Sequence, residues 1–162
     1  MRTNKNFRLQ IMFAVASCLL VIGINVHGQE SHTQKVARVI NETGFNFTKA
    51  GDGVWTIPFE GKVQKDITVV ISVSEDLLTL FSIVAVKKDF KPTPELHQKL
   101  LRFNDDLDRV KVGIDKDGDI FVRIDLSIRN LDKDELKVNI DQAAAAADEV
   151  FKAVKPTFVK TK

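Results

Sequence analysis

The feature that most constrains the fold is a hairpin pattern in residues 109–128, RVKVGIDKDGDIFVRIDLSI. Apolar and polar residues alternate along both halves of this stretch, which is typical of two strands that each bury one face. The alternating apolar residues are Val110, Val112, Ile114, Ile120, Val122, Ile124, Leu126 and Ile128. The pattern therefore predicts an antiparallel β-hairpin with a single buried face.

The turn of this hairpin determines which residues face each other. Side chains alternate between the two faces of a strand. Because the apolar residues of both strands have even numbers, they share one face only if the two residue numbers of each facing pair add up to an even number. A three-residue loop of Lys116, Asp117 and Gly118 meets this condition, with Gly118 in the left-handed conformation of a bulged turn. A two-residue Asp-Gly loop would send half of the apolar residues to the wrong face. In the predicted register, Phe121 lies beside Gly113 on the face opposite to the one that carries these apolar residues.

Residues 1–28 have the composition of a secretory signal peptide. Three basic residues occur within the first eight positions, and an almost unbroken apolar run follows at residues 11–24. This run is shorter than the roughly 20 residues that a membrane span needs. Small residues precede a cleavage position after Gly28. We therefore predict export, to the periplasm in a bacterial host, with no stable membrane span after cleavage; a retained anchor is the alternative.

Cys18 raises a second possibility for the same segment. Residues 15–18 resemble a bacterial lipoprotein box, but the apolar residues 19–22 follow the cysteine where a lipoprotein turns polar. Cleavage after Gly28 is therefore preferred over lipidation of Cys18. No other cysteine is present, so the exported part of the chain must depend on its hydrophobic core instead of disulfides.

The charge of the chain argues against a nucleic-acid partner. Loss of residues 1–28 leaves 21 Lys and Arg against 22 Asp and Glu, a formal net charge of −1. Opposite charges are interleaved, and no basic stripe is present. Residues 29–156 are long enough for one domain with a sizeable core, and residues 157–162 are interpreted as a C-terminal tail.

The first half of this domain predicts one helix and three strands. The helix covers residues 30–43, and Gly44 is its expected end. The strands are predicted at residues 54–59, 66–73 and 77–86. Residues 45–53 are interpreted as a brief alternation followed by a turn. The third strand is apolar on both faces, which is typical of a central strand or of one whose second face meets another molecule.

Two further helices flank the hairpin in the sequence. Thr93 and Pro94 begin the first one. Asp132 caps the second, with Glu135 completing a capping box, and Pro156 ends it. Its apolar stripe consists of Leu136, Ile140, Ala143, Ala147, Val150 and Val154. A helix of about 24 residues is roughly 36 Å long, enough to cross a whole sheet.

The alanine run at residues 143–147 has two explanations. Alanine has a high helix propensity and lets a helix pack closely on a sheet. Alternatively, the missing side-chain bulk leaves a shallow groove that receives an apolar segment. The first explanation is preferred, and Ala143 and Ala147 are kept as candidates for a partner-binding surface.

No pattern of catalytic or metal-ligating residues stands out. The carboxylates of residues 115–119 do not have calcium-loop spacing, because an EF-hand needs glycine at position 6 and glutamate at position 12. Here glycine is at position 4 and Leu126 at position 12. His32 and His97, the histidines beyond the signal segment, have no evident nucleophile beside them. We therefore predict no catalytic residues, no metal site, no cofactor and no enzymatic activity.

Large apolar side chains are also expected on the face of the sheet opposite the helices. Apolar surface of this kind suggests burial against a partner or a second copy of the chain. Cover by another helix of the same chain is equally compatible with the sequence. The candidate partner-binding residues are Trp55, Leu77, Phe81, Phe121, Ala143 and Ala147.

The predicted order is helix, three strands, helix, two strands and a long helix. This order, with FNDDLDRVKVGIDKDGDIFVRIDLSI leading into LDKDELKVNIDQAAAAADEV, resembles the YbjN-like branch of the type III secretion chaperone-like (CesT-type) fold. The resemblance covers roughly residues 29–156 and is strongest over residues 95–156. It implies an α+β domain with an antiparallel sheet of about five strands flanked by helices. It also implies a protein that is often dimeric, binds polypeptide segments and has no established catalytic residues.

The sequence thus favours an exported, non-enzymatic, chaperone-like domain that binds a protein or peptide segment. The partner can be a second copy of the chain, which would make the protein a homodimer. The secretion chaperones of this fold act in the cytoplasm, so the export signal is a departure from them. An alternative is a small-ligand carrier or envelope sensor with an interior pocket. A third is a catalyst whose site is completed by another subunit.

Overall fold

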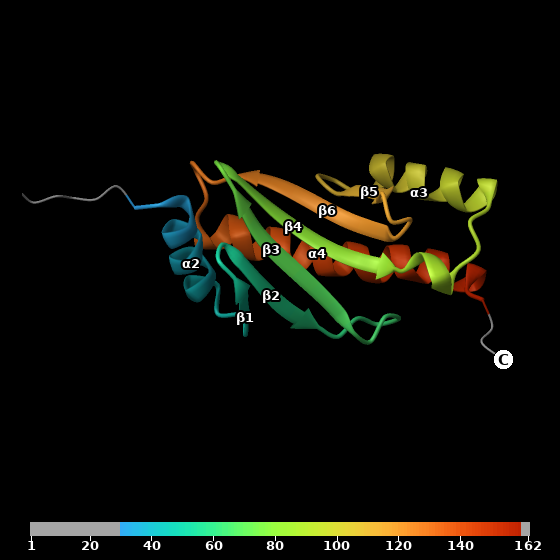
Figure 1. Cartoon of the computed structure of the whole chain (residues 1–162), viewed down its shortest axis with the longest axis horizontal. Coiled ribbons are helices and arrows are strands. Elements are labelled where there is room, and N and C mark those ends of the chain that lie inside the picture. Colours follow the sequence, from blue (N-terminus) through green and yellow to red (C-terminus); the bar gives the residue numbers. More distant parts are fainter. Residues whose placement is uncertain (1–29, 160–162) are drawn as a thin grey trace, which may run out of the picture.

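The computed structural model describes residues 30–159. The predicted signal segment, Cys18 and the last three residues lie outside this range. The helices and strands (Figure 1) are α2 (His32–Thr43), β1 (Thr48–Gly51), β2 (Val54–Phe59), β3 (Ile67–Ser74), β4 (Leu77–Ala85), α3 (Pro94–Asp106), β5 (Lys111–Ile114), β6 (Ile120–Ser127) and α4 (Lys133–Val154). Within this range, no helix combines the length and the apolar character that crossing a bilayer requires.

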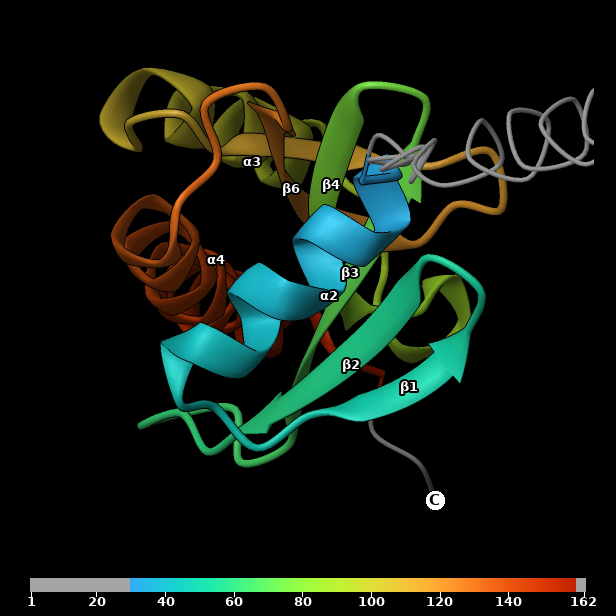
Figure 2. The same ribbon diagram turned by 90° about the vertical axis from the view of Figure 1, so that its left-hand side faces the viewer.

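The strands form one antiparallel sheet in the order β1-β2-β3-β4-β6-β5. Helix α4 lies across one face, α3 lies beside the β5 edge, and α2 crosses one end next to α4 (Figure 2). The predicted α+β architecture is confirmed, but the sheet has six strands instead of about five. The missed strand is β1, which pairs with β2 inside the segment interpreted as an alternation and a turn. Its residues are mostly exposed, so it lacks the apolar alternation that reveals the other strands.

The hairpin of β5 and β6 has the predicted register. Gly113 lies opposite Phe121, and Gly118 closes the loop with a φ of 91°. Seven of the eight alternating apolar residues are buried. Ile114 is the exception: it is 40% exposed because it ends the short edge strand β5, beyond the cover of the helices.

Helix α4 builds the core by packing on the central strands. It contacts β3, β4 and β6, and it has 22 residues, close to the predicted length. All six residues of the predicted stripe are 0% exposed, Ala143 and Ala147 among them. Small side chains let the helix approach the sheet closely, so the first explanation of the alanine run is confirmed. The groove hypothesis is wrong for these two alanines, since a partner cannot reach them.

The helix ends follow the predicted signals with one exception. Gly44 ends α2 in the left-handed conformation, and Thr93 accepts a hydrogen bond from the Leu96 amide. Asp132 caps α4 by accepting hydrogen bonds from two backbone amides. The side chain of Glu135 does not complete a capping box: it accepts a hydrogen bond from Arg109 Nη1 at 2.7 Å.

The start of the predicted C-terminal tail is packed against the domain. Lys91 donates its amide to the Thr157 carbonyl at 3.0 Å, and Phe158 forms a β-bridge with Phe90. The ring of Phe158 also lies edge-on to Phe151, at 5.4 Å between the ring centroids. Residues 157–159 therefore extend the fold beyond the predicted domain end at residue 156.

Ser82 is a polar exception in the core. It lies on the α4 side of β4, is 0% exposed, and its hydroxyl makes no hydrogen bond within the described chain. A buried hydroxyl without a partner keeps its desolvation cost, so Ser82→Ala should raise the free energy of unfolding by about 1 kcal/mol. Urea denaturation measures the change, with Ser72→Ala on the other face as the control. A less stable Ser82→Ala variant would mean that the hydroxyl contributes a favourable interaction.

Candidate functional site

The face of the sheet away from α4 is the candidate site, and we call it the outer face. Figure 1 shows α4 behind the sheet, and no described helix crosses in front of β3 and β4. Side chains alternate between buried and partly exposed along β4 and β6, which assigns every second residue to this face. The residues of this face include Val70, Leu77, Thr79, Phe81, Ile83, Lys111, Phe121, Arg123 and Asp125. Cover by another helix, which the sequence left open, is therefore absent from the described chain.

Three of the six candidate residues lie on the outer face, namely Leu77, Phe81 and Phe121. The prediction for Trp55 is wrong. Trp55 is 2% exposed and pairs with Ile71, which is 0% exposed, so it faces the core. The predicted strand at residues 54–59 is β2, whose residues alternate between the two faces of the sheet. Alternation alone cannot tell which of the two faces the helices cover.

Phe81 and Phe121 form an aromatic pair at the centre of this face. Their ring centroids lie 5.5 Å apart with the planes tilted by 31°. A Cβ at position 113 would lie 2.9 Å from Phe121 Cζ, so only glycine lets the ring lie over β5. Both side chains are half-buried, which leaves part of each ring exposed to solvent.

A polar cluster lies beside the aromatic pair. The Asp125 carboxylate accepts hydrogen bonds from Lys111 Nζ at 2.7 Å, Arg123 Nε at 2.7 Å and Thr79 Oγ1 at 2.9 Å. Burial alone would raise the pKa of Asp125, but the hydrogen bonds from Lys111, Arg123 and Thr79 outweigh it and lower the pKa. The carboxylate is therefore ionised at neutral pH, and it is shared by two cations.

The Asn104 side chain forms hydrogen bonds with the backbone at the outer edge of β5, a role that the sequence does not reveal. Asn104 on α3 donates to the Val112 carbonyl at 3.1 Å and accepts from the Val112 amide at 2.9 Å. Its side-chain amide thus occupies the place that a neighbouring strand would take at this residue. Nothing in the sequence distinguishes Asn104 from other polar residues on the exposed side of a helix.

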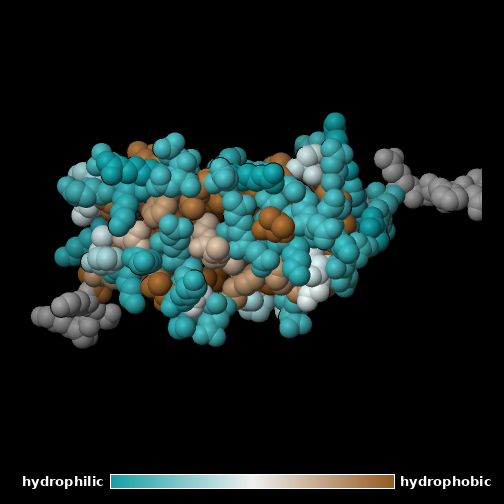
Figure 3. Space-filling model, turned by 180° about the vertical axis from the view of Figure 1, so that it is seen from behind, coloured by the Kyte–Doolittle hydropathy of each residue, from teal (hydrophilic) through white to brown (hydrophobic). Residues whose placement is uncertain are grey.

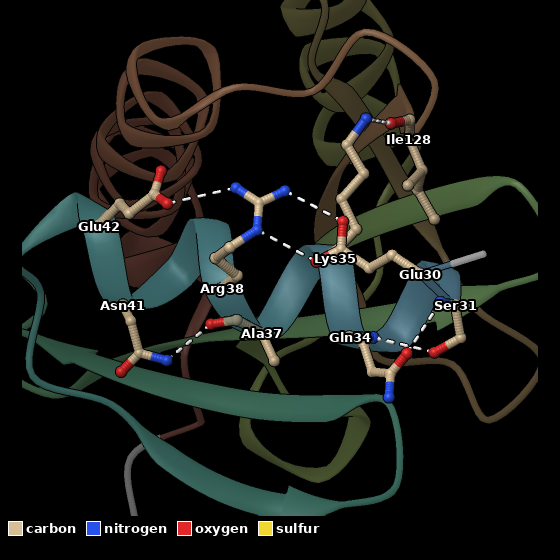
Figure 4. A network of polar contacts seen from close by, with 9 residues as sticks. All are labelled: Glu30, Ser31, Gln34, Lys35, Ala37, Arg38, Asn41, Glu42 and Ile128. Carbon is tan, nitrogen blue, oxygen red and sulfur yellow. Dashed lines mark hydrogen bonds and ion pairs between the residues drawn. The ribbon is translucent and has the colours of Figure 1, made fainter. Parts of the chain in front are cut away.

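Helix α2 is anchored at one end of the sheet by polar contacts (Figure 4). Lys35 Nζ donates to the Ile128 carbonyl at 2.7 Å. It also donates to the Arg129 carbonyl at 2.7 Å. Arg38 bonds Glu30 and Glu42 along the helix, and its hydrogen bond to Glu30 lowers the pKa of that carboxyl. The Lys35 contacts hold α2 against the segment between β6 and α4.

Three hollows of the described chain lie along α4. One of about 500 Å³ lies between α4 and the loop that follows β2, and two others, of about 520 and 350 Å³, lie near its N-terminus. Charged side chains line all three, Lys62 and Glu149 among them in the first. The α4 side is largely hydrophilic with small separate apolar patches (Figure 3). Because charged side chains line each of these three hollows, none of them is the apolar interior pocket of the small-ligand alternative.

The carboxylates of Asp115 and Asp119, in the β5–β6 turn, accept hydrogen bonds from backbone amides. Asp115 accepts from the amides of Asp117 and Asp119 at 2.9 Å each, and Asp119 accepts from the Lys87 amide at 2.8 Å. Among residues 30–159, no group of three or more His, Cys, Asp or Glu side chains is placed to hold a metal ion. This arrangement is that of a capped turn.

Comparison with known proteins is consistent with this geometry. Residues 32–156 match the YbjN family model, described as "Putative bacterial sensory transduction regulator". No curated protein matches the chain.

Several solved structures share the fold at low sequence identity. The crystal structure of YbjN from E. coli superposes with a TM-score of 0.60 at 13% identity, covering 81% of this chain and 96% of that one. A chain of the heterodimeric ExoU-SpcU complex from the type III secretion system of Pseudomonas aeruginosa gives 0.56 at 15% identity, covering 74% and 98%. A chain of the ExsC-ExsE complex gives 0.58 at 14% identity, covering 75% and 95%. The chain therefore belongs to the YbjN family and has the fold that YbjN shares with these secretion-system proteins.

Proposed function

We propose that this protein is an exported, non-enzymatic, chaperone-like domain that binds a protein or peptide segment on its outer face. The observation that carries the proposal is the Phe81–Phe121 pair, half-buried on a sheet face that no described helix covers. Similar folds occur in complexes with other proteins, such as ExoU-SpcU and the HopA1-SchA chaperone-effector complex. Those partners belong to those proteins and indicate only the kind of ligand that this fold can take.

The exposed apolar side chains of the outer face can contribute to the affinity for a partner. Full burial of one large apolar side chain contributes roughly 1.5–3 kcal/mol, and association costs are subtracted from this gain. Phe81 and Phe121 are partly exposed, and Leu77 is 36% exposed at one end of the same face. Micromolar binding needs roughly 8 kcal/mol, so these anchors supply only part of the binding free energy. Polar and backbone contacts of a bound segment, or of a second copy, must supply the rest.

Export is the second part of the proposal. It depends on the basic and apolar composition of residues 1–28, with cleavage after Gly28 and a periplasmic location. N-terminal sequencing of the protein recovered from a bacterial envelope tests it. A mature N-terminus at Gln29 supports cleavage, whereas a lipid on Cys18 or an intact N-terminus contradicts it.

Phe121→Ser should weaken self-association or partner binding by about tenfold or more, because it removes half of the aromatic pair. Light scattering of residues 29–162 across micromolar concentrations measures the dimer, and capture from envelope extract measures other partners. Leu101→Ser is the control, since Leu101 is 71% exposed on α3, away from the outer face. An unfolded Phe121→Ser variant would instead make Phe121 an ordinary core residue and remove the basis of the proposal.

A further inference from the structure

The outer face carries more positive than negative charge at its centre. Lys111 and Arg123 face each other across β5 and β6, and both bond the single carboxylate of Asp125. The side chain of Asp125 is 14% exposed, whereas those of Arg123 and Lys111 are 40% and 66% exposed. The anion is therefore withdrawn from solvent and the two cations are presented to it.

Arg123 also has hydrogen-bonding capacity to spare. Its Nε donates to Asp125 at 2.7 Å and its Nη2 lies 3.4 Å from Thr79 Oγ1. Its Nη1 makes no hydrogen bond to any residue in the range 30–159. A guanidinium carries five donors in a planar fork that fits a carboxylate. The exposed side of Arg123 can thus accept a second carboxylate without releasing Asp125.

The cationic and aromatic parts of the face adjoin each other. Phe121 and Arg123 are two residues apart on β6, which places their Cα atoms roughly 7 Å apart on the same face. Phe81 pairs directly with Arg123 across β4 and β6. An apolar side chain of a partner that packs on the aromatic pair would therefore lie next to the cationic side chain of Arg123.

We propose that the partner segment of the outer face is acidic and apolar. An apolar side chain of the segment packs on Phe81 and Phe121, and a carboxylate two residues along an extended chain bonds Arg123 and Lys111. This inference rests on the proposed function of the outer face and adds the charge of its partner. The added carboxylate would balance two cations with two anions, and such charge-assisted hydrogen bonds are stronger than neutral ones.

A polypeptide fits this face better than a small molecule. Sites for small ligands are concave and enclose most of the ligand. The hollows described above lie along α4, and none of them is lined by Phe81, Phe121 or Arg123. An open sheet face with alternating side chains instead matches an extended segment whose own side chains alternate.

Three fluorescein-labelled twelve-residue peptides test the charge of the partner. The first repeats Leu-Ser-Glu-Ser, which places a leucine and a glutamate on one side of an extended chain at the spacing of Phe121 and Arg123. The second replaces glutamate by lysine, and the third replaces leucine by serine. Fluorescence anisotropy with residues 29–162 at low salt should show the first binding at least about tenfold more tightly than either of the others.

Variants at position 123 assign the effect to the guanidinium. Arg123→Gln should reduce binding of the leucine–glutamate peptide about fivefold to tenfold, and Arg123→Lys should restore much of it because the charge returns. Arg102→Gln on α3 is the matched control, with the same loss of charge on an exposed surface elsewhere, and should leave binding unchanged. Circular dichroism checks that each variant is folded.

The outcomes separate this inference from the proposed function. Equal binding of the glutamate and lysine peptides, with both weakened by Phe121→Ser, would overturn the charge inference and leave apolar recognition standing. Tighter binding of the lysine peptide, or equal loss in Arg123→Gln and Arg102→Gln, would also overturn it. No binding of either leucine peptide, or binding that Phe121→Ser does not weaken, would count against the outer face as a binding site.

Discussion

Ala147→Leu is expected to lower the free energy of unfolding by about 2–3 kcal/mol. Ala147 is 0% exposed between α4 and the sheet, so three added carbon atoms have no space there and must push the helix away. Urea denaturation followed by Trp55 fluorescence measures the effect, because Trp55 is the only tryptophan and is buried in the same core.

Ala145→Leu is the matched control, since Ala145 lies two residues earlier on the same helix and is exposed. Its stability should stay within about 0.5 kcal/mol of the parent. Equal stability of the two variants would contradict the close packing of α4 on the sheet. Such a result would revive the idea that the alanine run leaves free space for another segment.

Asp148→Ala is expected to lower the free energy of unfolding by about 2 kcal/mol. The Asp148 carboxylate accepts from the amides of Lys62, Val63 and Gln64 at 3.0, 2.8 and 2.7 Å, which fastens the β2–β3 loop to α4. Gly61 leaves room for this contact, because a Cβ there would collide with the carboxylate. Amide hydrogen exchange of residues 61–65 should also become faster. Asp141→Ala, which removes a neighbouring exposed carboxylate on α4, is the control.

The stability that is lost on substitution of Asp148 should depend on pH. Hydrogen bonds from the Gln64, Val63 and Lys62 amides lower the pKa of Asp148 from its usual 3.8, with the Gln64 amide the largest cause. A lowered pKa contributes stability that is present above the unfolded-state pKa and is lost as the pH falls through the folded-state pKa. Asp148→Asn should therefore cost most near neutral pH and progressively less in acid. A cost that is independent of pH would mean that the charge of Asp148 does not matter to the loop.

Features that repeat along the sequence could be predicted without the structure. The register of the β5–β6 hairpin follows from the alternation of apolar residues and the turn residues, because a three-residue loop keeps both apolar sets on one face and a two-residue loop does not. The stripe of α4 and the caps at Thr93 and Asp132 are likewise local, since they depend on residues within a few positions of each other. These same elements carry the resemblance by which the YbjN family was correctly anticipated.

The tertiary structure alone decided which face of each strand the helices cover. Alternation divides β2 into two sets but cannot say which one α4 will bury, and Trp55 was placed on the wrong side for this reason. Asp148 accepts a hydrogen bond from the Lys62 amide, and Asn104 accepts one from the Val112 amide. Each of these bonds joins a side chain to the backbone of another part of the fold. Such contacts leave no periodic trace in the sequence, because one polar residue satisfies them and many polar residues look alike. Sequence periodicity therefore determined the elements and the family, and packing determined which side chains remain exposed on the outer face.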